Sequence, residues 1–414
     1  MDEAGMVGGA VERIPKVRRS RIVVTARDSS GKPLAGCRIR LVQETHEFLL
    51  GCNAFALFSG EEGRQERYQS AFSALFNYAT LPFYWGSYEK ERGVKRVADL
   101  ERMARWCRER CIAVKGHPLV WHEVWPKWGP MDADGARSMS EARVRELVSW
   151  FAGLVDRWDV VNEATVSERF ENGVGAWAKR DGSAAMVGEC LSWARQAGPR
   201  ACLLYNDYNI SPEFESLVGA LKGQGSPFDA IGIQSHMHQG EWTLEKAWTV
   251  CETYARFGLP LHFTELTVLS GEHGWLKAAP WPTTPEGEGS QAEYVEKLYT
   301  VLFSHPAVAA VTWWDMGDGS WQGAPAGLVR ADLSPKPAYE RLRDLFLRRW
   351  RTAVEVETGA DGSVSVDAYR GTYSVSAATP AGLAAGRFRL GAAGATVEVV
   401  PGCVRTDPPP GVLA

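Results

Sequence analysis

Short apolar runs recur between amphipathic stretches from Leu49 to about Trp350. Eight runs have the length of a buried strand, and the segments between them repeat apolar residues at the helical period. In chain order the runs are L-L-G-C-N-A-F, F-N-Y-A-T-L, I-A-V-K-G-H-P-L-V, W-D-V-V-N, A-C-L-L-Y-N, A-I-G-I-Q, L-H-F-T-E and A-V-T-W-W. This alternation predicts parallel strands joined by crossover helices.

Residues that could carry chemistry stand at the C-terminal ends of these runs, among them Asn162, Glu163 and Glu265. A closed (β/α)₈ barrel builds its active site at that end of its strands. The repeated placement therefore favours a barrel over a doubly wound sheet. We predict the α/β class, with a TIM barrel that spans residues 49–350.

The pattern changes at both flanks of this region. In residues 351–404 the helical period disappears, and alternating segments between Gly-rich turns predict a small all-β domain. Residues 21–48 alternate around S-S-G-K-P and predict a β-hairpin. Because an isolated hairpin is marginally stable, we expect it to join the C-terminal strands in a sandwich-like accessory domain. That domain would support the barrel structurally or, alternatively, bind carbohydrate.

The two ends of the chain are expected to be solvated. Residues 1–20 end in a basic patch and predict a flexible tail, and residues 405–414, with the string T-D-P-P-P-G, predict disorder. Neither a basic start followed by an apolar segment nor a run of roughly 18 apolar residues is visible. We expect no membrane contact. The localisation stays open between the cytoplasm and a secreted form trimmed of its leader.

The composition of the chain limits the classes of molecule that it is expected to bind. A net charge of −4 provides no broad basic surface, so we expect a small or neutral substrate and no nucleic acid. The 17 Trp suit a glycan site, because indole faces stack on sugars, although Trp also fills cores. The eight Cys form no C-x-x-C pair, and His117, His122, His236 and His238 lack an acid at a familiar zinc spacing. We expect no metal and no cofactor.

Two glutamates could form a catalytic pair. Splitting a glycosidic bond with retention needs two carboxyl groups about 5 to 5.5 Å apart, one protonated and one ionised. The fourth predicted strand ends W-D-V-V-N-E-A with Glu163, and the seventh ends L-H-F-T-E-L-T with Glu265. These strands lie on opposite walls of a barrel mouth, so both side chains can face one sugar. Either glutamate alone would suit a surface carboxylate or a salt bridge.

Six strings between residues 115 and 339 carry a family resemblance: K-G-H-P-L-V-W-H, W-D-V-V-N-E-A, L-L-Y-N-D-Y-N, I-G-I-Q-S-H, F-T-E-L and S-P-K-P-A-Y. In order and placement they resemble glycoside hydrolase family 10, the endo-β-1,4-xylanase family. With G-C-N-A-F and E-K-E-R-G upstream, the resemblance covers the barrel but neither β extension.

The resemblance implies roles for matching residues. Glu163 would be the acid/base, Glu265 the nucleophile, and His236 the histidine that orients it. Asn162 would hold the 2-hydroxyl of the sugar under attack. The remaining substrate contacts would come from His117, Trp121, Asn206, Gln234, Tyr84, Trp85, Trp321 and either Trp313 or Trp314. Each Trp could instead pack the core, and Asn206 could be buried polar scaffolding.

The chain departs from the family at three places. The family run E-N-x-M-K-W, which grips the second sugar, reads T-L-P-F-Y-W and ends in Trp85. The glutamine of H-x-Q-x-P-x-W is replaced by Val124, and the aspartate of T-E-L-D by Thr267. We expect Phe83, Tyr84 and Trp125 to make this side of the cleft more apolar. A site that loses its hydroxyl partners loses the matching specificity.

We therefore predict a monomeric retaining β-glycosidase that acts on xylan or a related plant glycan. One alternative is a hydrolase of decorated oligosaccharides or of aryl or terpenoid glycosides. Another is a catalytically inactive glycan-binding protein on the same barrel.

Overall fold

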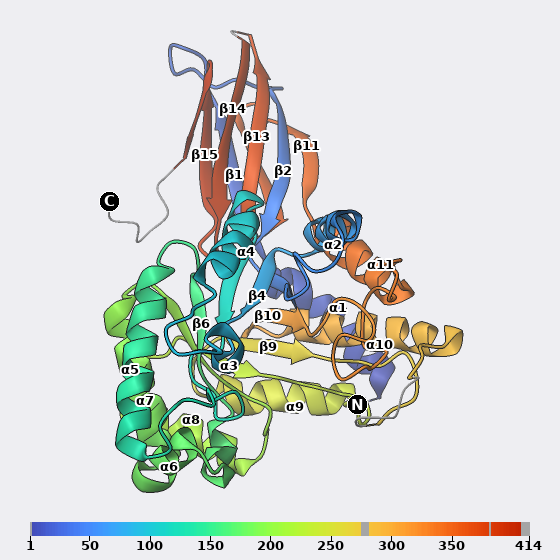
Figure 1. The fold of residues 1–414 in the computed structure, drawn as a ribbon. Helices are drawn as coiled ribbons and strands as arrows, with labels where there is room; N and C mark the ends of the chain where they lie inside the picture. Colours follow the sequence, from blue (N-terminus) through green and yellow to red (C-terminus); the bar gives the residue numbers. More distant parts are fainter. Residues whose placement is uncertain (1, 275–280, 381, 407–414) are drawn as a thin grey trace. The chain divides into compact units, whose positions relative to one another are not determined.

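The computed structural model describes residues 2–274, 281–380 and 382–406. The chain forms two compact units (Figure 1). The barrel unit comprises Leu49–Leu298 and Ala307–Glu340, and the β unit comprises Met1–Phe48, Tyr299–Pro306 and Arg341–Ala414. No helix in the described part of the chain is long and apolar enough to cross a lipid bilayer.

Eight parallel strands close into a barrel in the order β10-β3-β4-β5-β6-β7-β8-β9. The strands are β3 (Leu49–Asn53), β4 (Tyr78–Pro82), β5 (Ala113–His117), β6 (Arg157–Asn162), β7 (Cys202–Asp207), β8 (Ala230–Ile233), β9 (Leu261–Leu266) and β10 (Val308–Trp313). Each coincides with one of the eight apolar runs, so the predicted TIM barrel is confirmed.

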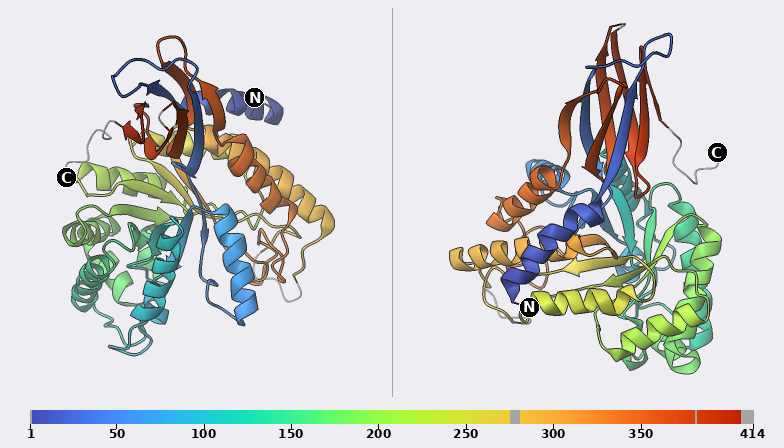
Figure 2. Two further views of the ribbon diagram at one scale, coloured as in Figure 1. Left: turned by 90° about the horizontal axis from the view of Figure 1, so that it is seen from above. Right: turned by 180° about the vertical axis from the view of Figure 1, so that it is seen from behind.

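Helices connect the strands and surround them (Figures 1 and 2). They are α2 (Glu62–Leu75), α3 (Trp85–Tyr88), α4 (Val97–Glu109), α5 (Ala133–Trp150), η1 (Ala164–Arg169), α6 (Gly173–Asp181), α7 (Ser183–Ala197), α8 (Pro212–Gly223), α9 (Leu244–Ala255) and α10 (Pro285–Ser304). Two further helices, α11 (Pro337–Asp344) and η2 (Leu345–Arg349), follow β10 and connect no barrel strands.

The barrel interior explains two of the strand residues. Trp158 is fully buried, and a Cβ at Gly116 would lie 2.2 Å from its ring, so only glycine fits opposite this indole. Nearby, Lys115 and Asp159 form a fully buried ion pair at 2.6 Å. Such a pair is costly to desolvate, and the attraction between its charges repays that cost only when the two groups are in close contact.

The β unit contains two four-stranded sheets, β12-β1-β15-β16 and β11-β2-β13-β14. The strands are β1 (Arg19–Ala26), β2 (Arg38–His46), β11 (Ala353–Glu357), β12 (Ser363–Tyr369), β13 (Gly371–Thr379), β14 (Gly382–Leu390), β15 (Ala395–Val400) and β16 (Cys403–Thr406). Apolar residues of both sheets share one core, which includes Ile22, Val24, Ile39, Leu41 and Val375.

The predicted hairpin of residues 21–48 is wrong. β1 pairs with β12 and β15, whereas β2 pairs with β11 and β13, so the two strands belong to different sheets. Only one bridge, Arg27 to Pro33, links the segments. Leu34 then packs against the shared core as the chain crosses from one sheet to the other.

The flexible tail predicted for residues 1–20 is also wrong, because α1 (Glu3–Arg18) is a helix. The Asp2 side chain caps its first turn, and Ala10 and Ile14 are buried. Arg18 is 6% exposed and donates to the carbonyls of Phe303 at 2.6 Å and His305 at 2.8 Å. The basic patch therefore contains a buried anchor.

The predicted C-terminal tail begins too early. Strand β16 continues to Thr406 and pairs with β15, so residues 405 and 406 are ordered in the sheet. The rest of that tail, residues 407–414, lies outside the described residues.

Candidate active site

Glu163 follows β6 directly and has a left-handed backbone with φ 56°. Non-glycine residues rarely adopt this conformation, which aims the side chain at the cost of local strain. Its carboxyl group accepts hydrogen bonds from the side chains of Gln234 at 2.7 Å, Trp121 at 3.0 Å and Asn162 at 3.2 Å. Three predicted site residues thus hold this carboxyl group.

The pKa of Glu163 is raised to about 8. Burial is the largest cause, because it disfavours the charged form, and the negative charges of Glu265, Asp207 and Glu123 act in the same direction. The hydrogen bond from Gln234 opposes the shift but does not cancel it. Glu163 is therefore protonated at neutral pH, as a general acid must be.

Glu265 lies in β9 and is 4% exposed. Its carboxylate accepts from Asn206 at 2.9 Å and contacts His236 at 3.2 Å and His117 at 3.8 Å. Burial alone would raise the pKa of Glu265, but the charges of His117, His236 and Lys115 and the hydrogen bond to His236 outweigh it and lower the pKa. Glu265 is thus suited to act in its ionised form.

Asn206 connects the two carboxyl groups. Its amide donates to Glu265 at 2.9 Å and to Asn162 at 2.8 Å, and Asn162 in turn donates to Glu163 at 3.2 Å. The Thr264 hydroxyl donates to the Asn206 carbonyl at 2.5 Å and so fixes the orientation of the amide. The two glutamates therefore belong to one buried hydrogen-bond network.

His117 and His236 are each held by a second group. His117 Nδ1 lies 2.8 Å from Asp159, which also pairs with Lys115. His236 Nδ1 lies 2.7 Å from the hydroxyl of Thr267, so the threonine still provides a hydrogen-bonding partner. The supporting roles of Lys115 and Asp159 were not predicted from the sequence, although K-G-H and W-D-V place both on strands of the site.

Aromatic rings surround these carboxyl groups and histidines. Trp321 stacks on His236 at 4.8 Å and 6°, and the Trp314 ring lies 5.4 Å from His117. Tyr84 lies 5.4 Å from His117 and 5.8 Å from Trp121. These rings form apolar walls on which a sugar could stack.

Three other aromatic residues lie elsewhere. Trp313 is fully buried and donates to the Ala326 carbonyl, so of the two neighbouring tryptophans it is Trp314 that contacts the histidines. Trp85 is 4% exposed and donates to Glu89. Phe83, expected in the cleft, is fully buried in the core.

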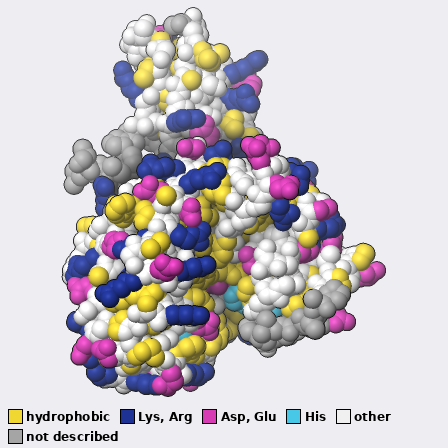
Figure 3. Space-filling view, viewed as in Figure 1, with side chains coloured by type: hydrophobic (Ala, Val, Ile, Leu, Met, Phe, Trp, Pro, Cys, Tyr) yellow, Lys and Arg dark blue, Asp and Glu magenta, His cyan; other side chains and the backbone are white. Residues whose placement is uncertain are grey.

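Two pockets share Tyr84. One of about 380 Å³ is lined by Phe55, Trp314, Asp315, Trp321 and others, and one of about 750 Å³ is lined by Trp121, Glu123, Trp125, Lys90, Lys127 and others. Figure 3 shows a hollow on the barrel unit, with hydrophobic and histidine side chains in it.

Asp315 is a carboxyl group that sequence reasoning missed. It has φ 65°, accepts from Asn53 at 2.9 Å and lines the smaller pocket. Burial raises the pKa of Asp315 to about 6, against the hydrogen bond from Asn53. No motif signalled it, because its importance depends on the pocket around it.

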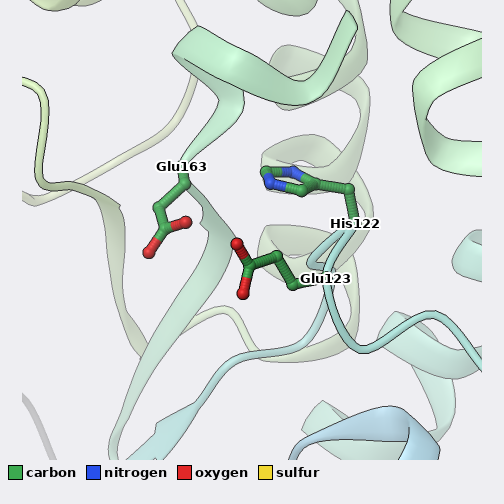
Figure 4. Close-up of side chains that lie close together, drawn as sticks. All are labelled: His122, Glu123 and Glu163. Atoms are coloured by element: carbon green, nitrogen blue, oxygen red, sulfur yellow. The ribbon is translucent and has the colours of Figure 1, made fainter. Parts of the chain in front are cut away.

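One group of described residues has the geometry to hold a metal ion. Ligand atoms of His122, Glu123 and Glu163 all lie within 4.8 Å of one another (Figure 4). His122 was not expected to bind a metal, because no partner acid stands at a familiar zinc spacing in the sequence. Glu163, 41 positions later, supplies an acid that local spacing could not reveal.

Comparisons with known proteins match most of the chain. The sequence profile of Glycosyl hydrolase family 10 matches residues 51–345. Endo-1,4-beta-xylanase B of Thermotoga neapolitana is 29% identical over 68% of this chain and 84% of its own length. Anti-sigma-I factor RsgI6 of Acetivibrio thermocellus is 26% identical over 90% of this chain and 46% of its own length.

The fold has close counterparts among solved structures. Xylanase 10B from Thermotoga petrophila RKU-1, in complex with xylobiose, is similar with a TM-score of 0.63 and 27% identity, over 73% of this chain and 95% of that one.

Proposed function

Because this chain belongs to glycosyl hydrolase family 10, we propose that it hydrolyses xylan or a related β-linked plant glycan with retention of configuration. The observation that carries the proposal is the pair of buried glutamates with opposite pKa shifts in one hydrogen-bond network. Two carboxyl groups in opposite protonation states are what acid-assisted glycoside hydrolysis requires, and the family resemblance implies retention.

The proposed reaction has two steps. Glu163 donates its proton to the leaving glycosidic oxygen while Glu265 attacks the anomeric carbon and forms a covalent glycosyl-enzyme. Esterification removes the charge of Glu265, which is one cause of the raised pKa of Glu163, so that pKa falls. Glu163 then takes a proton from water, and the water releases the sugar.

The neighbouring polar residues would position the sugar. Asn162 contacts both Glu163 and Asn206, a place from which it can bind the 2-hydroxyl beside the reacting carbon. His117 and His236, held by Asp159 and Thr267, would keep Glu265 ionised and oriented. Binding the 2-hydroxyl strengthens in the transition state and so contributes to rate.

A decorated or aryl-substituted glycoside is the second candidate substrate. The pocket of about 750 Å³ has walls of Tyr84, Trp121 and Trp125, where the resemblance implies a polar grip on the second sugar. Trp121 also donates to Glu163. Aromatic walls favour an apolar or bulky group over a pattern of hydroxyls. Unbranched xylan would then be cleaved more slowly than a substituted glycoside.

A glycan-binding protein without catalysis is the candidate from another class. A relative that is similar over 90% of this chain is named an anti-sigma factor and not a xylanase, so not every relative carries the name of an enzyme. Against this candidate stands the raised pKa of Glu163, since sugar binding alone needs no general acid.

Product analysis tests the proposal. Xylan, other β-linked polysaccharides and aryl β-xylosides are incubated with wild type, with Glu265→Ala, and with Glu62→Gln, which removes an exposed carboxylate of α2. We expect oligosaccharides from wild type and Glu62→Gln and none from Glu265→Ala. Proton NMR of the first product should show the β anomer.

Each other outcome discriminates between the candidates. Turnover of aryl or substituted glycosides alone would support the second substrate class. An α anomer as first product would contradict retention. Sugar binding by wild type, Glu163→Ala and Glu265→Ala alike, with no turnover of any substrate, would establish the binding protein.

A further inference from the structure

Three side chains converge beside the acid/base. His122 and Glu123 lie on the segment that follows β5, and Glu163 follows β6. Their ligand atoms lie within 4.8 Å of one another, and Figure 4 shows the His122 ring and the Glu123 carboxylate both directed toward Glu163. This is the one such group among the described residues.

His122 supplies an independent sign of a ligand. The side chain is 1% exposed, yet its Nε2 atom has no hydrogen-bond partner, while Nδ1 lies 3.0 Å from the Ser167 hydroxyl. The ring is fixed against Phe170, with centroids 3.9 Å apart. A buried polar atom without a partner is costly, and a bound ion would remove that cost.

The hydrogen bond between His122 Nδ1 and Ser167 bears on metal binding by the other ring nitrogen. If Nδ1 donates to Ser167, Nε2 carries a free lone pair, which is the form that binds transition metals. The second nitrogen is thus already oriented by a hydrogen bond.

Glu123 and Glu163 complete a mixed set of ligands, and Glu163 gives up its proton to solvent when an ion binds. Of the Glu163 oxygens, Oε2 accepts from Trp121 alone, at 3.0 Å, so it has room for a further contact. Glu123 is exposed and can adjust its position. One imidazole and two carboxylates with an open fourth position match zinc-class cations, whereas Mg²⁺ and Ca²⁺ prefer oxygen ligands alone.

We propose that His122, Glu123 and Glu163 bind a divalent cation of the zinc class, and that the bound ion inhibits hydrolysis by occupying the carboxyl group of the acid. Binding of the ion requires only the three side chains. The inhibitory consequence rests on the proposed function of Glu163. The two parts are therefore tested separately.

Calorimetric titration with ZnCl₂ tests binding without reference to activity. Wild type should bind one Zn²⁺ that MgCl₂ does not replace. Glu123→Gln should weaken binding at least tenfold, whereas Glu62→Gln, the same change at a distant exposed position, should not. His122→Asn keeps an amide near the position of Nδ1 for Ser167 but removes Nε2, and should also abolish tight binding.

Equal zinc affinity in wild type, Glu123→Gln and His122→Asn would overturn the proposal, as would no binding by wild type. Because Glu123 is exposed, its variant stays informative even if His122→Asn fails to fold. Rate measurements then test inhibition: Zn²⁺ should slow wild type and affect Glu123→Gln at least tenfold less. Zinc binding by a chain that hydrolyses no glycan would refute the proposed function and leave the metal site intact.

Discussion

At the scale of single residues, two glutamates with the same chemistry acquire different protonation states from their neighbours. Glu163 accepts from amide and indole N–H groups and lies near other carboxylates, whereas Glu265 faces His117 and His236. Burial disfavours the charge on both, and the histidines reverse its effect on Glu265 only. The division between acid and nucleophile is thus set by the surroundings.

This difference predicts the pH profile. Glu163 acts protonated and has its pKa raised to about 8, so kcat/KM should fall as the pH rises through about 8. Glu265 acts ionised and has its pKa lowered, so the acid limb should lie below the ordinary value of 4.5. The measurement is kcat/KM for a glycoside with a poor leaving group, with a chelator present.

An aryl glycoside with a good leaving group provides the control for that profile. Such a substrate needs little help from an acid, so its first step should be less sensitive to alkaline pH. An alkaline limb near the ordinary pKa of glutamate, for both substrates, would contradict the role of Glu163.

Thr267 is the residue at which the support of the nucleophile can be measured. Its hydroxyl lies 2.7 Å from His236 Nδ1, and loss of one hydrogen bond costs about 1 kcal/mol, or roughly fivefold in rate. We expect Thr267→Val to lower kcat by that factor with KM little changed. Thr267→Ser keeps the hydroxyl and should retain the rate; equal losses in both variants would indicate a packing defect instead.

The sequence reveals those site residues whose position along a strand implies their role. Glu163 and Glu265 each end a barrel strand, so their convergence follows from the fold. The bridge through Asn206 and the support from Asp159 could not be inferred, because both depend on side-chain directions across strands. Trp313 and Trp314 show the same limit, since Trp313 is the last residue of β10 and is buried in the core, while Trp314 just beyond the strand contacts the histidines.

At the scale of elements, the parallel strands were predictable and the partners of the antiparallel strands were not. A barrel strand is buried on both faces and reads as a continuous apolar run. Alternation in β1 and β2 reveals one buried face each but not which strand lies alongside, and their partners are far away in sequence. Helix α1 escaped notice because few of its side chains are buried.

The packing of α1 gives a stability prediction. Ile14 is 2% exposed, and truncation of a buried isoleucine costs about 2 to 5 kcal/mol, so Ile14→Ala should lower the free energy of unfolding by about that amount. Val11 on the same helix is 56% exposed, and Val11→Ala should change the free energy of unfolding by less than about 0.5 kcal/mol. Urea unfolding followed by circular dichroism measures both; equal small effects would mean that the helix is not anchored in solution.

At the scale of the whole molecule, the sequence pattern indicated two units and the boundary after Phe48, but not the later boundaries. The break after Phe48 is where the barrel unit begins, yet the β unit also includes Tyr299–Pro306 and Arg341–Trp350, which follow the helical pattern of the barrel region. The hydrogen bonds from Arg18 to Phe303 and His305 connect α1 to the segment Tyr299–Pro306 within the β unit. A helical period reports the local structure, not the core that a helix joins.

The whole mechanism also predicts how the enzyme responds to metal removal. The proposed reaction uses two carboxyl groups and water, and the histidines that face Glu265 have their Nδ1 atoms occupied by Asp159 and Thr267. Dialysis against EDTA should therefore leave kcat unchanged in metal-free preparations and restore it where zinc was bound. A loss of more than about half the activity, recovered on adding Mg²⁺ or Ca²⁺, would show that a cation is required, because a bound inhibitor cannot produce a loss on removal.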